Sequence, residues 1–121
     1  MPTWLNIVII ALIVLFLVKR IMPVKGVKSI STTDLKGLLK DVNKQFIDVR
    51  TPGEFKAKHI REFQNMPLNT LGQQAQQVLS KDKEVIVICQ SGMRSSQASK
   101  LLKKMGFEKV TNVRGGMSAW L

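Results

Sequence analysis

The stretch "EVIVICQSGMRSSQASKLLKKMGF", residues 84–107, carries the strongest fold prediction in the sequence. Its first part, "EVIVI", is apolar and β-branched on both faces, as is typical of a central strand in a covered parallel sheet. Its last part, "SSQASKLLKKMGF", has apolar residues at helical spacing and stops at Gly106, a residue type that commonly ends helices. Between the two lies the chain's one cysteine, Cys89, where the predicted strand gives way to a short loop.

Strand and helix patterns alternate from about residue 27 onward. Further strands are predicted for "GVKSIS" at 26–31, "QFIDV" at 45–49 and "KVTNV" at 109–113. Helices are predicted over 32–42, around 54–58 and over 70–79, with Thr32 or Thr33 capping the first and a terminal turn or helix at 115–121. Such alternation predicts an α/β fold, a mostly parallel central sheet with helices on both faces. Ligands of such sheets bind at the carboxyl ends of the strands, where Asp48–Arg50 and Cys89–Arg94 are expected to meet.

The first residues differ from this domain. Leu5–Val18 carries no charge, and Lys19 and Arg20 close it. We predict a transmembrane anchor at 1–22, a basic linker at 23–28 and the α/β domain at 29–121. As a helix, Trp4–Val18 is only ~22 Å long, so the flanking residues would have to complete the span. A signal peptide and a buried core helix are the alternatives. The first lacks preceding basic residues and a cleavage site, and the second lacks an obvious packing partner.

Charge gives the expected orientation and the expected partners. The formal net charge is +11, and the basic residues near the apolar run all follow it. By the positive-inside rule, we expect a single-pass membrane protein with the domain in the cytoplasm. A basic domain suits anionic lipid headgroups and small anionic substrates. Nucleic acid is not expected as a partner, because the basic residues are scattered and aromatic residues are few.

The cysteine and histidine counts exclude some kinds of site. One cysteine rules out an internal disulfide and fits a reducing compartment. With one thiol and one histidine, His59, there is no ligand set for structural zinc, and we predict no metal site. His59 is more simply a structural residue than the base of a Cys–His pair.

The loop from Cys89 to Arg94 contains groups that are expected to stabilise a negatively charged, nucleophilic sulfur. Gly92 permits backbone angles that let successive N–H groups converge as an anion-binding nest. The following helix adds its unpaired N-terminal donors and the positive end of its dipole. Arg94 supplies a fixed positive charge with a fork of donors suited to an oxyanion. Each feature stabilises a thiolate over a thiol, so the loop predicts a reactive sulfur in a cradle for an anionic substrate.

At this loop the sequence resembles the rhodanese family. The family's Cys-x-x-Gly-x-Arg-Ser loop is matched by Cys89, Gly92, Arg94 and Ser95. "IDVRTPGEF" at 47–55 resembles the Asp-x-Arg…Glu-Phe/Tyr segment, and "NVRGGMSAW" at 112–120 resembles the closing Gly-Gly…Trp motif. His59-Ile60, Asn65 and Pro67 match parts of the intervening segment. The blocks keep the family's order over most of residues 29–120, which makes the resemblance specific.

The resemblance implies a single-domain sulfurtransferase that needs no metal or organic cofactor. Cys89 would take a sulfane sulfur from a small anionic donor such as thiosulfate and hold it as a persulfide. A thiol, of a small molecule or a protein, or cyanide would then accept the sulfur. Substrate contacts would come from the rest of the loop, with Asp48 and Arg50 in support. These substrate-binding residues are Gln90, Ser91, Gly92, Met93, Arg94 and Ser95.

Two other functions are weighed against this one. Cysteine phosphatases use Cys-x5-Arg, whereas four residues separate Cys89 from Arg94 here, and the shorter loop suits a sulfur atom. A rhodanese-like binding or redox-signalling module at the membrane, with little turnover, is the second alternative. The sequence also departs from the family, with Lys58 in place of a glycine and Glu62-Phe63 in place of Gly-Ala. These larger residues are expected to reshape one connection near the site.

Overall fold

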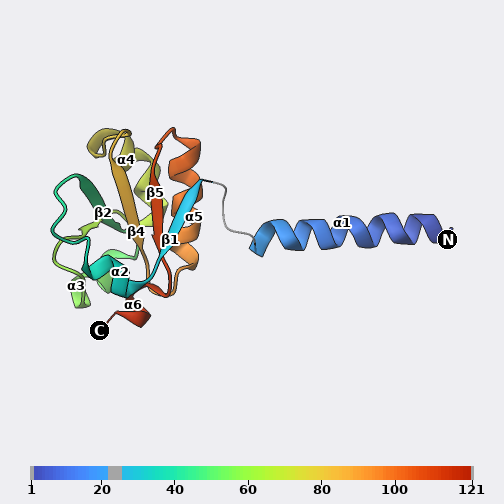
Figure 1. Ribbon diagram of the computed structural model, residues 1–121, viewed down its shortest axis with the longest axis horizontal. Helices are drawn as coiled ribbons and strands as arrows, with labels where there is room; N and C mark the ends of the chain where they lie inside the picture. Colours follow the sequence, from blue (N-terminus) through green and yellow to red (C-terminus); the bar gives the residue numbers. More distant parts are fainter. Residues whose placement is uncertain (1, 22–25, 121) are drawn as a thin grey trace.

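The computed structural model describes residues 2–21 and 26–120, and its centre is a five-stranded parallel sheet (Figure 1). Every pair of neighbouring strands is parallel, and the order across the sheet is β1-β5-β4-β2-β3. The predicted α/β class is therefore confirmed. The strands are β1 (Val27–Ile30), β2 (Lys44–Asp48), β3 (Gln64–Asn65), β4 (Glu84–Ile88) and β5 (Val110–Val113).

The middle strand, β4, organises the core. Its residues from Val85 to Ile88 have no exposed surface, as the run of β-branched residues predicts. Because side chains alternate along a strand, Val85 and Val87 enter one buried cluster, and Ile86 and Ile88 enter the other. The register of β2 against β4 places Asp48 opposite Ile88. The segments that follow these two strands therefore start side by side.

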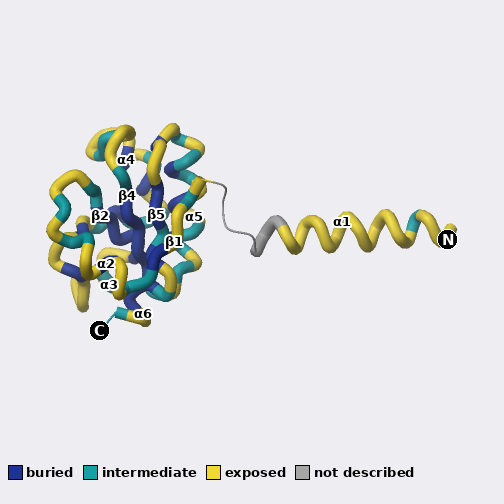
Figure 2. The backbone as a smooth tube through the Cα atoms, in the orientation of Figure 1, coloured by how far each residue is buried: buried dark blue, intermediate teal, exposed yellow. Residues whose placement is uncertain are grey.

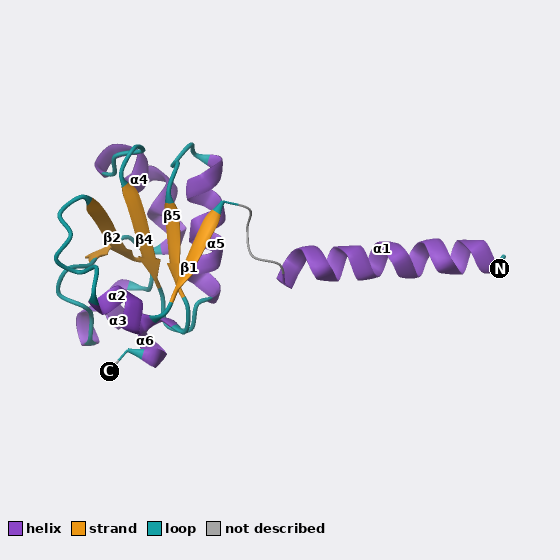
Figure 3. Ribbon diagram, in the orientation of Figure 1, coloured by secondary structure: helices purple, strands orange, loops and turns teal. Residues whose placement is uncertain are grey.

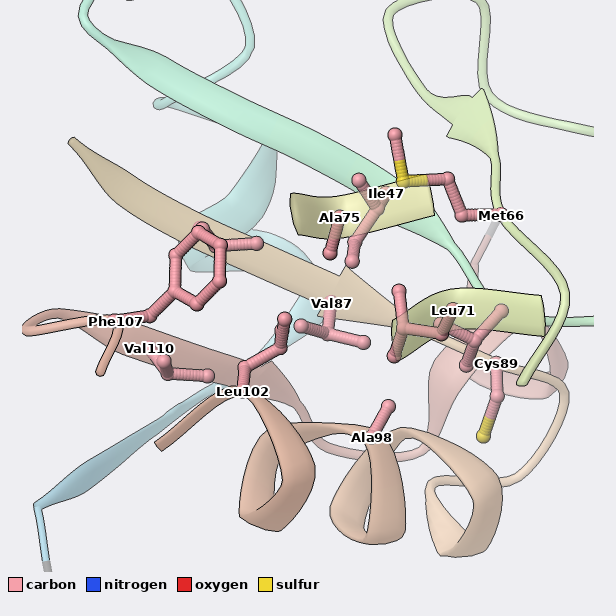
Figure 4. Packing of buried hydrophobic residues seen from close by; sticks show 12 residues of the cluster. Ile47, Met66, Leu71, Ala75, Val87, Cys89, Ala98, Leu102, Phe107 and Val110 are labelled. Carbon is pink, nitrogen blue, oxygen red and sulfur yellow. The ribbon is translucent and has the colours of Figure 1, made fainter. Parts of the chain in front are cut away.

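Helices cover both faces of the sheet, as predicted (Figure 3). On one face, α4 (Leu71–Val78) and α5 (Met93–Lys104) pack onto the cluster that contains Cys89 (Figure 4). On the other face, α2 (Thr32–Lys36) and α6 (Gly116–Ala119) contribute Leu35 and Met117 to the second cluster. The remaining elements of the domain are α3 (Pro52–Ala57) and a 3-10 turn, η1 (Leu68–Thr70).

Two local predictions differ from the structure. The first domain helix, α2, stops at Lys36, because Gly37 ends it and turns follow. Its cap is Ser31, not Thr32 or Thr33. The Ser31 hydroxyl accepts a hydrogen bond from the Asp34 N–H at 3.1 Å, and the Asp34 carboxylate accepts one from the Ser31 N–H at 3.3 Å. This reciprocal pairing is the capping box, which satisfies two donors at the helix start.

The predicted membrane anchor is contradicted. The helix α1 (Thr3–Ile21) does form, and most apolar residues between Trp4 and Val18 are exposed (Figure 2). Among residues 2–21 and 26–120, however, none of the helices combines the length and the apolar character that a membrane span requires. The uncharged run Leu5–Val18 covers only about 21 Å of helix, against a hydrocarbon core of about 30 Å. The predicted single-pass topology, with the domain in the cytoplasm, is therefore wrong.

The predicted basic linker spans the boundary of the described region. Residues 22–25 lie outside the described residues, which resume at Gly26. Val27 and Lys28 belong to β1, where they pair with Val110 and Thr111 of β5.

Candidate active site

Cys89 lies directly after β4, at the carboxyl edge of the sheet. The chain then turns through Gly92, whose φ of 106° is in the left-handed region, and enters α5 at Met93. Glycine adopts that angle without the steric cost that a Cβ imposes. The strand-to-helix connection predicted from the sequence is therefore present, with the cysteine at its first residue.

Two groups contact the Cys89 sulfur. The Gly92 N–H donates to Sγ at 2.9 Å, and the Ser95 hydroxyl lies 3.3 Å from Sγ. The Cys89 side chain is fully buried beside Leu71 and Ala98 (Figure 4). A donor can therefore reach the sulfur only after side chains around it shift.

A polar network behind the sulfur includes a residue that the sequence did not single out. The Ser95 hydroxyl, which touches Sγ, also lies 2.5 Å from Oδ1 of Asn112 and 3.1 Å from the Gly92 carbonyl oxygen. Asn112 is opposite Val87 in the sheet, and so faces the cysteine side. The one sign of it in the sequence was a polar residue, Asn112, before the last valine of the predicted strand "KVTNV".

Arg94 is engaged by another residue in this structure. Its guanidinium forms a two-pronged pair with the Glu54 carboxylate, at 2.6 Å from Nη1 to Oε1 and 2.9 Å from Nη2 to Oε2. The Arg94 hydrogen bonds lower the pKa of Glu54 to about 2, and the same hydrogen bonds raise the pKa of Arg94. The sequence showed Glu54 only as a motif position, with no role.

Asp48 and Arg50 form a buried ion pair that ties the strand ends together. Arg50 Nη2 donates to Asp48 Oδ2 at 2.8 Å and to the Lys58 carbonyl oxygen at 2.6 Å. Its Nη1 reaches Oε1 of Gln90 in the cysteine loop at 3.3 Å. A buried charge needs such partners to offset its lost hydration. Both residues therefore connect the end of β2 with Gln90 and with the backbone at Lys58.

The other predicted loop residues differ in their contacts and in their exposure to solvent. Gln90 bonds to Arg50 and, through Nε2, to the Ser118 hydroxyl at 3.2 Å. Ser91 is exposed, and Met93 has three quarters of its surface exposed, at 75%. Of the predicted substrate-binding residues, Gly92 and Ser95 are therefore the two that hydrogen-bond to the sulfur.

The terminal Gly-Gly motif is part of the same site. The N–H groups of Met117 and Ser118 donate to the carbonyl oxygens of Cys89 and Gln90, at 2.8 and 2.9 Å. Gly116 sits so close to the loop that a Cβ there would lie 2.2 Å from the Cys89 carbonyl oxygen. The start of α6 therefore holds the cysteine loop from behind, which the sequence motif alone did not reveal.

The residues that depart from the expected motif are not among those that hydrogen-bond to the Cys89 sulfur. Phe63 is buried in the second cluster, where its ring lies 5.3 Å from that of Phe46. Glu62 is exposed. The Lys58 backbone is extended, at a φ of −163°, so this position does not require glycine.

Two cavities flank the Arg94–Glu54 pair. The first, which we call the Arg94 cavity, has a volume of about 280 Å³. It is lined by Val49, Thr51, Pro67, Leu68, Asn69 and Arg94. The second, the Lys58 cavity, has a volume of about 360 Å³ and is lined by Arg50, Glu54, Ala57, Lys58, Gln90 and Met117. Among the described residues, no three His, Cys, Asp or Glu side chains are grouped to hold a metal ion.

Comparison with known proteins gives one consistent family. The model of the rhodanese-like domain matches residues 31–121. The chain is 39% identical over 95 residues to the putative sulfurtransferase YtwF of Bacillus subtilis, covering 78% of this chain and 90% of that protein. It is 35% identical over 74 residues to a sulfurtransferase of Allochromatium vinosum, covering 61% and 68%.

Two further relatives are considerably longer than the matched region. The chain spans 60% of the B. subtilis protein YqhL, to which it is 40% identical over 76 residues, and 43% of the putative sulfur carrier protein YrkF. Among solved structures, a rhodanese-like domain protein from Staphylococcus aureus superposes with a TM-score of 0.71 at 32% identity. That match covers 78% of this chain and 91% of the other.

Proposed function

The chain belongs to the rhodanese-like domain family, and from that membership we propose that it is a sulfurtransferase whose sulfur carrier is Cys89. The single observation that carries the proposal is the hydrogen bond from the Gly92 N–H to Sγ at 2.9 Å, made by a loop at the carboxyl edge of a parallel sheet. A backbone donor so placed stabilises negative charge on sulfur, both on the attacking thiolate and on the persulfide that follows.

The reaction proceeds in two displacements. The Cys89 thiolate attacks the outer sulfur of a donor such as thiosulfate, and a new S–S bond forms as the bond to the sulfonate sulfur breaks. Sulfite leaves with that electron pair. The thiolate of an acceptor then attacks the outer sulfur of the Cys89 persulfide, and the Cys89 thiolate leaves. Covalent storage of the sulfur splits one transfer into two simpler steps.

The surrounding residues have separate tasks in this scheme. Gly92 and Ser95 contact the sulfur that changes charge. Arg94 binds the anionic part of the donor, after exchanging or sharing its present contact with Glu54. Asp48 and Arg50 hold the end of β2, the backbone at Lys58 and the side chain of Gln90 in fixed positions relative to one another.

Steady-state kinetics with thiosulfate and cyanide test this proposal. Double-reciprocal plots at several cyanide concentrations should be parallel, because sulfite leaves before cyanide reacts. Cys89→Ser should abolish turnover and leave the far-ultraviolet circular dichroism spectrum unchanged. Turnover retained by Cys89→Ser would refute the role of Cys89.

A binding or redox-signalling module with little turnover is the second candidate. The observation that favours it is the complete burial of Cys89. Under this alternative the persulfide would form but would not be passed on to an acceptor. Incubation of the sulfur-loaded protein with cyanide or a small thiol distinguishes the two, because the sulfurtransferase should return to unmodified Cys89 and the module should not.

A further inference from the structure

The cation that would recruit an anionic donor is already neutralised in this structure. Arg94 and Glu54 form a two-pronged ion pair at 2.6 and 2.9 Å, and each side chain is about one third exposed. Arg94 is the one charged residue that lines the Arg94 cavity. A donor that enters this cavity therefore meets a guanidinium whose charge is balanced by a carboxylate.

Glu54 is fixed in place from its other side as well. Its Oε1 atom accepts hydrogen bonds from the Thr51 N–H at 3.1 Å and from the Thr51 hydroxyl at 3.0 Å. The contact with the Thr51 N–H belongs to the capping box at the start of α3, so moving Glu54 away from Arg94 also costs a helix cap. Because the pKa of Glu54 is about 2, the carboxylate remains charged throughout the physiological pH range.

The Arg94 cavity has an apolar wall, and one residue of this wall, Val49, belongs to the same buried cluster as Cys89. Val49, Pro67 and Leu68 form this wall. The Val49 N–H bonds to the carbonyl oxygen of Ile88, the residue before Cys89, and Val49 and Cys89 share one buried cluster. At about 280 Å³, the cavity is near the lower end of the volumes that hold small organic ligands.

These observations point to a discriminating role for the carboxylate. We propose that Glu54 is a specificity-determining residue that disfavours doubly charged sulfur donors and favours singly charged donors with an apolar group. One negative charge on the donor can share Arg94, but a second one faces the fixed Glu54 carboxylate. The apolar group lies against Val49, Pro67 and Leu68. This inference rests on the proposed sulfur transfer through Cys89, and it names the donor class.

An organic thiosulfonate satisfies this description and undergoes the same chemistry as thiosulfate. The Cys89 thiolate bonds to its outer sulfur, the bond to the sulfonyl sulfur breaks, and a sulfinate leaves with the electron pair. Benzenethiosulfonate carries one negative charge and an aromatic ring, whereas thiosulfate carries two charges and no apolar group. The two donors load the same sulfur atom onto Cys89, so their rates can be compared directly.

The test compares both donors in the purified full chain and in three variants. For the full chain, kcat/KM with benzenethiosulfonate should exceed that with thiosulfate. Glu54→Gln keeps the size of the side chain and a capping-box residue type, but it removes the charge. This variant should raise kcat/KM for thiosulfate by roughly five- to tenfold, in keeping with the removal of a close like charge near the protein surface. It should change the value for benzenethiosulfonate by much less.

Controls separate charge at the site from charge elsewhere. Glu62→Gln removes an exposed carboxylate that lines neither cavity, and it should leave the ratio of the two donors unchanged. Leu68→Ala should lower kcat/KM for benzenethiosulfonate and leave that for thiosulfate nearly constant, because it shortens the apolar wall.

Three outcomes would overturn the proposal, and they are distinguishable. If Glu54→Gln leaves the donor ratio unchanged, or if the full chain prefers thiosulfate, Glu54 does not select the donor, although sulfur transfer through Cys89 stands. If neither donor places sulfur on Cys89 in the full chain or in Glu54→Gln, the proposed function fails together with this inference.

Discussion

The reactivity of Cys89 depends on which neighbouring groups can donate a hydrogen bond to its sulfur. The Gly92 N–H has a single hydrogen, and this hydrogen is directed at Sγ. The Ser95 hydroxyl is different, since its one hydrogen can go to Asn112 Oδ1, to the Gly92 carbonyl oxygen or to a thiolate. Asn112 therefore acts on the sulfur through Ser95, as a positioning residue.

Asn112→Asp should slow the reaction of Cys89. The substitution keeps the shape of the side chain and its acceptor oxygen, but it places a negative charge one hydroxyl away from the sulfur and so disfavours the thiolate. A like charge at such a distance is expected to reduce the rate of alkylation by iodoacetamide at pH 7 by roughly tenfold. Asn43→Asp, on an exposed turn, is the matched control and should react as the unmodified protein does. Equal rates in all three proteins would remove Asn112 from the account.

The Glu54–Arg94 pair should make a small, pH-dependent contribution to stability. The pKa of Glu54 is lowered from 4.5 to about 2 in the folded protein, so the contribution is present above pH 4.5 and is lost as the pH falls toward 2. Because the pair is partly exposed, Glu54→Gln should reduce the free energy of unfolding by less than ~1 kcal/mol near neutral pH.

Urea unfolding of the full chain and of Glu54→Gln between about pH 2 and pH 7 measures this effect. The two midpoints should differ near neutrality and converge at the acid end. A difference that stays constant over the whole range would mean that the carboxylate charge is not its source.

At the scale of single residues, the sequence predicted which residues lie together around Cys89. It did not predict the ion pair between Arg94 and Glu54. Cys89, Gly92 and Ser95 contact one another because they are close in the chain, so their spacing was informative. Arg94 and Glu54 are 40 residues apart, and whether a guanidinium faces a ligand or a carboxylate depends on the fold that joins them.

At the scale of the element, the short terminal helix α6 supports the cysteine loop. Its N-cap Gly115 and its first residue Gly116 are both at positive φ, and the N–H groups of Met117 and Ser118 donate to the loop carbonyls. A side chain at Gly116 would collide with the Cys89 carbonyl oxygen, at 2.2 Å. Glycine is therefore required here both by backbone angle and by the approach of another segment.

Gly116→Ala should displace the cysteine loop. We expect a loss of about 2 kcal/mol or more in the free energy of unfolding, together with a fall in the rate of sulfur loading, because the new methyl group meets backbone that cannot rotate away. Thermal unfolding and a single-turnover loading assay measure the two effects.

The matched control is Gly53→Ala in α3, where a Cβ would meet nothing within 4 Å. That variant should be neutral or slightly stabilised, because alanine has the higher helix propensity. If Gly116→Ala behaves like Gly53→Ala, α6 does not hold the loop.

Element boundaries show where sequence patterns were sufficient. The strand β4 and the helix α5 were predicted well, because a long apolar run and a sustained helical period leave few alternatives. The short strand β3 was missed, since two residues, Gln64 and Asn65, form no detectable pattern. The helix α2 ended early, because Gly37 stopped it although Leu38 and Leu39 continue the apolar spacing.

At the scale of the whole molecule, the alternation of strands and helices was enough to predict a parallel sheet with covered faces. It also predicted the edge where the site lies, because carboxyl ends of parallel strands share one edge. The strand order β1-β5-β4-β2-β3 depends on crossover connections that local patterns do not encode. The N-terminal helix was judged from its hydropathy, but none of the helices in the described residues has both the length and the apolar character of a membrane span.

The central claim, that Cys89 carries the transferred sulfur, is tested most directly by intact mass spectrometry. The full chain is incubated with thiosulfate, freed of excess reagent and compared with Cys89→Ser treated in the same way. We predict a mass increase of ~32 Da, one sulfur atom, that maps to Cys89, disappears on addition of cyanide and is absent from the variant. No increase in the full chain, or an equal increase in Cys89→Ser, would contradict the account.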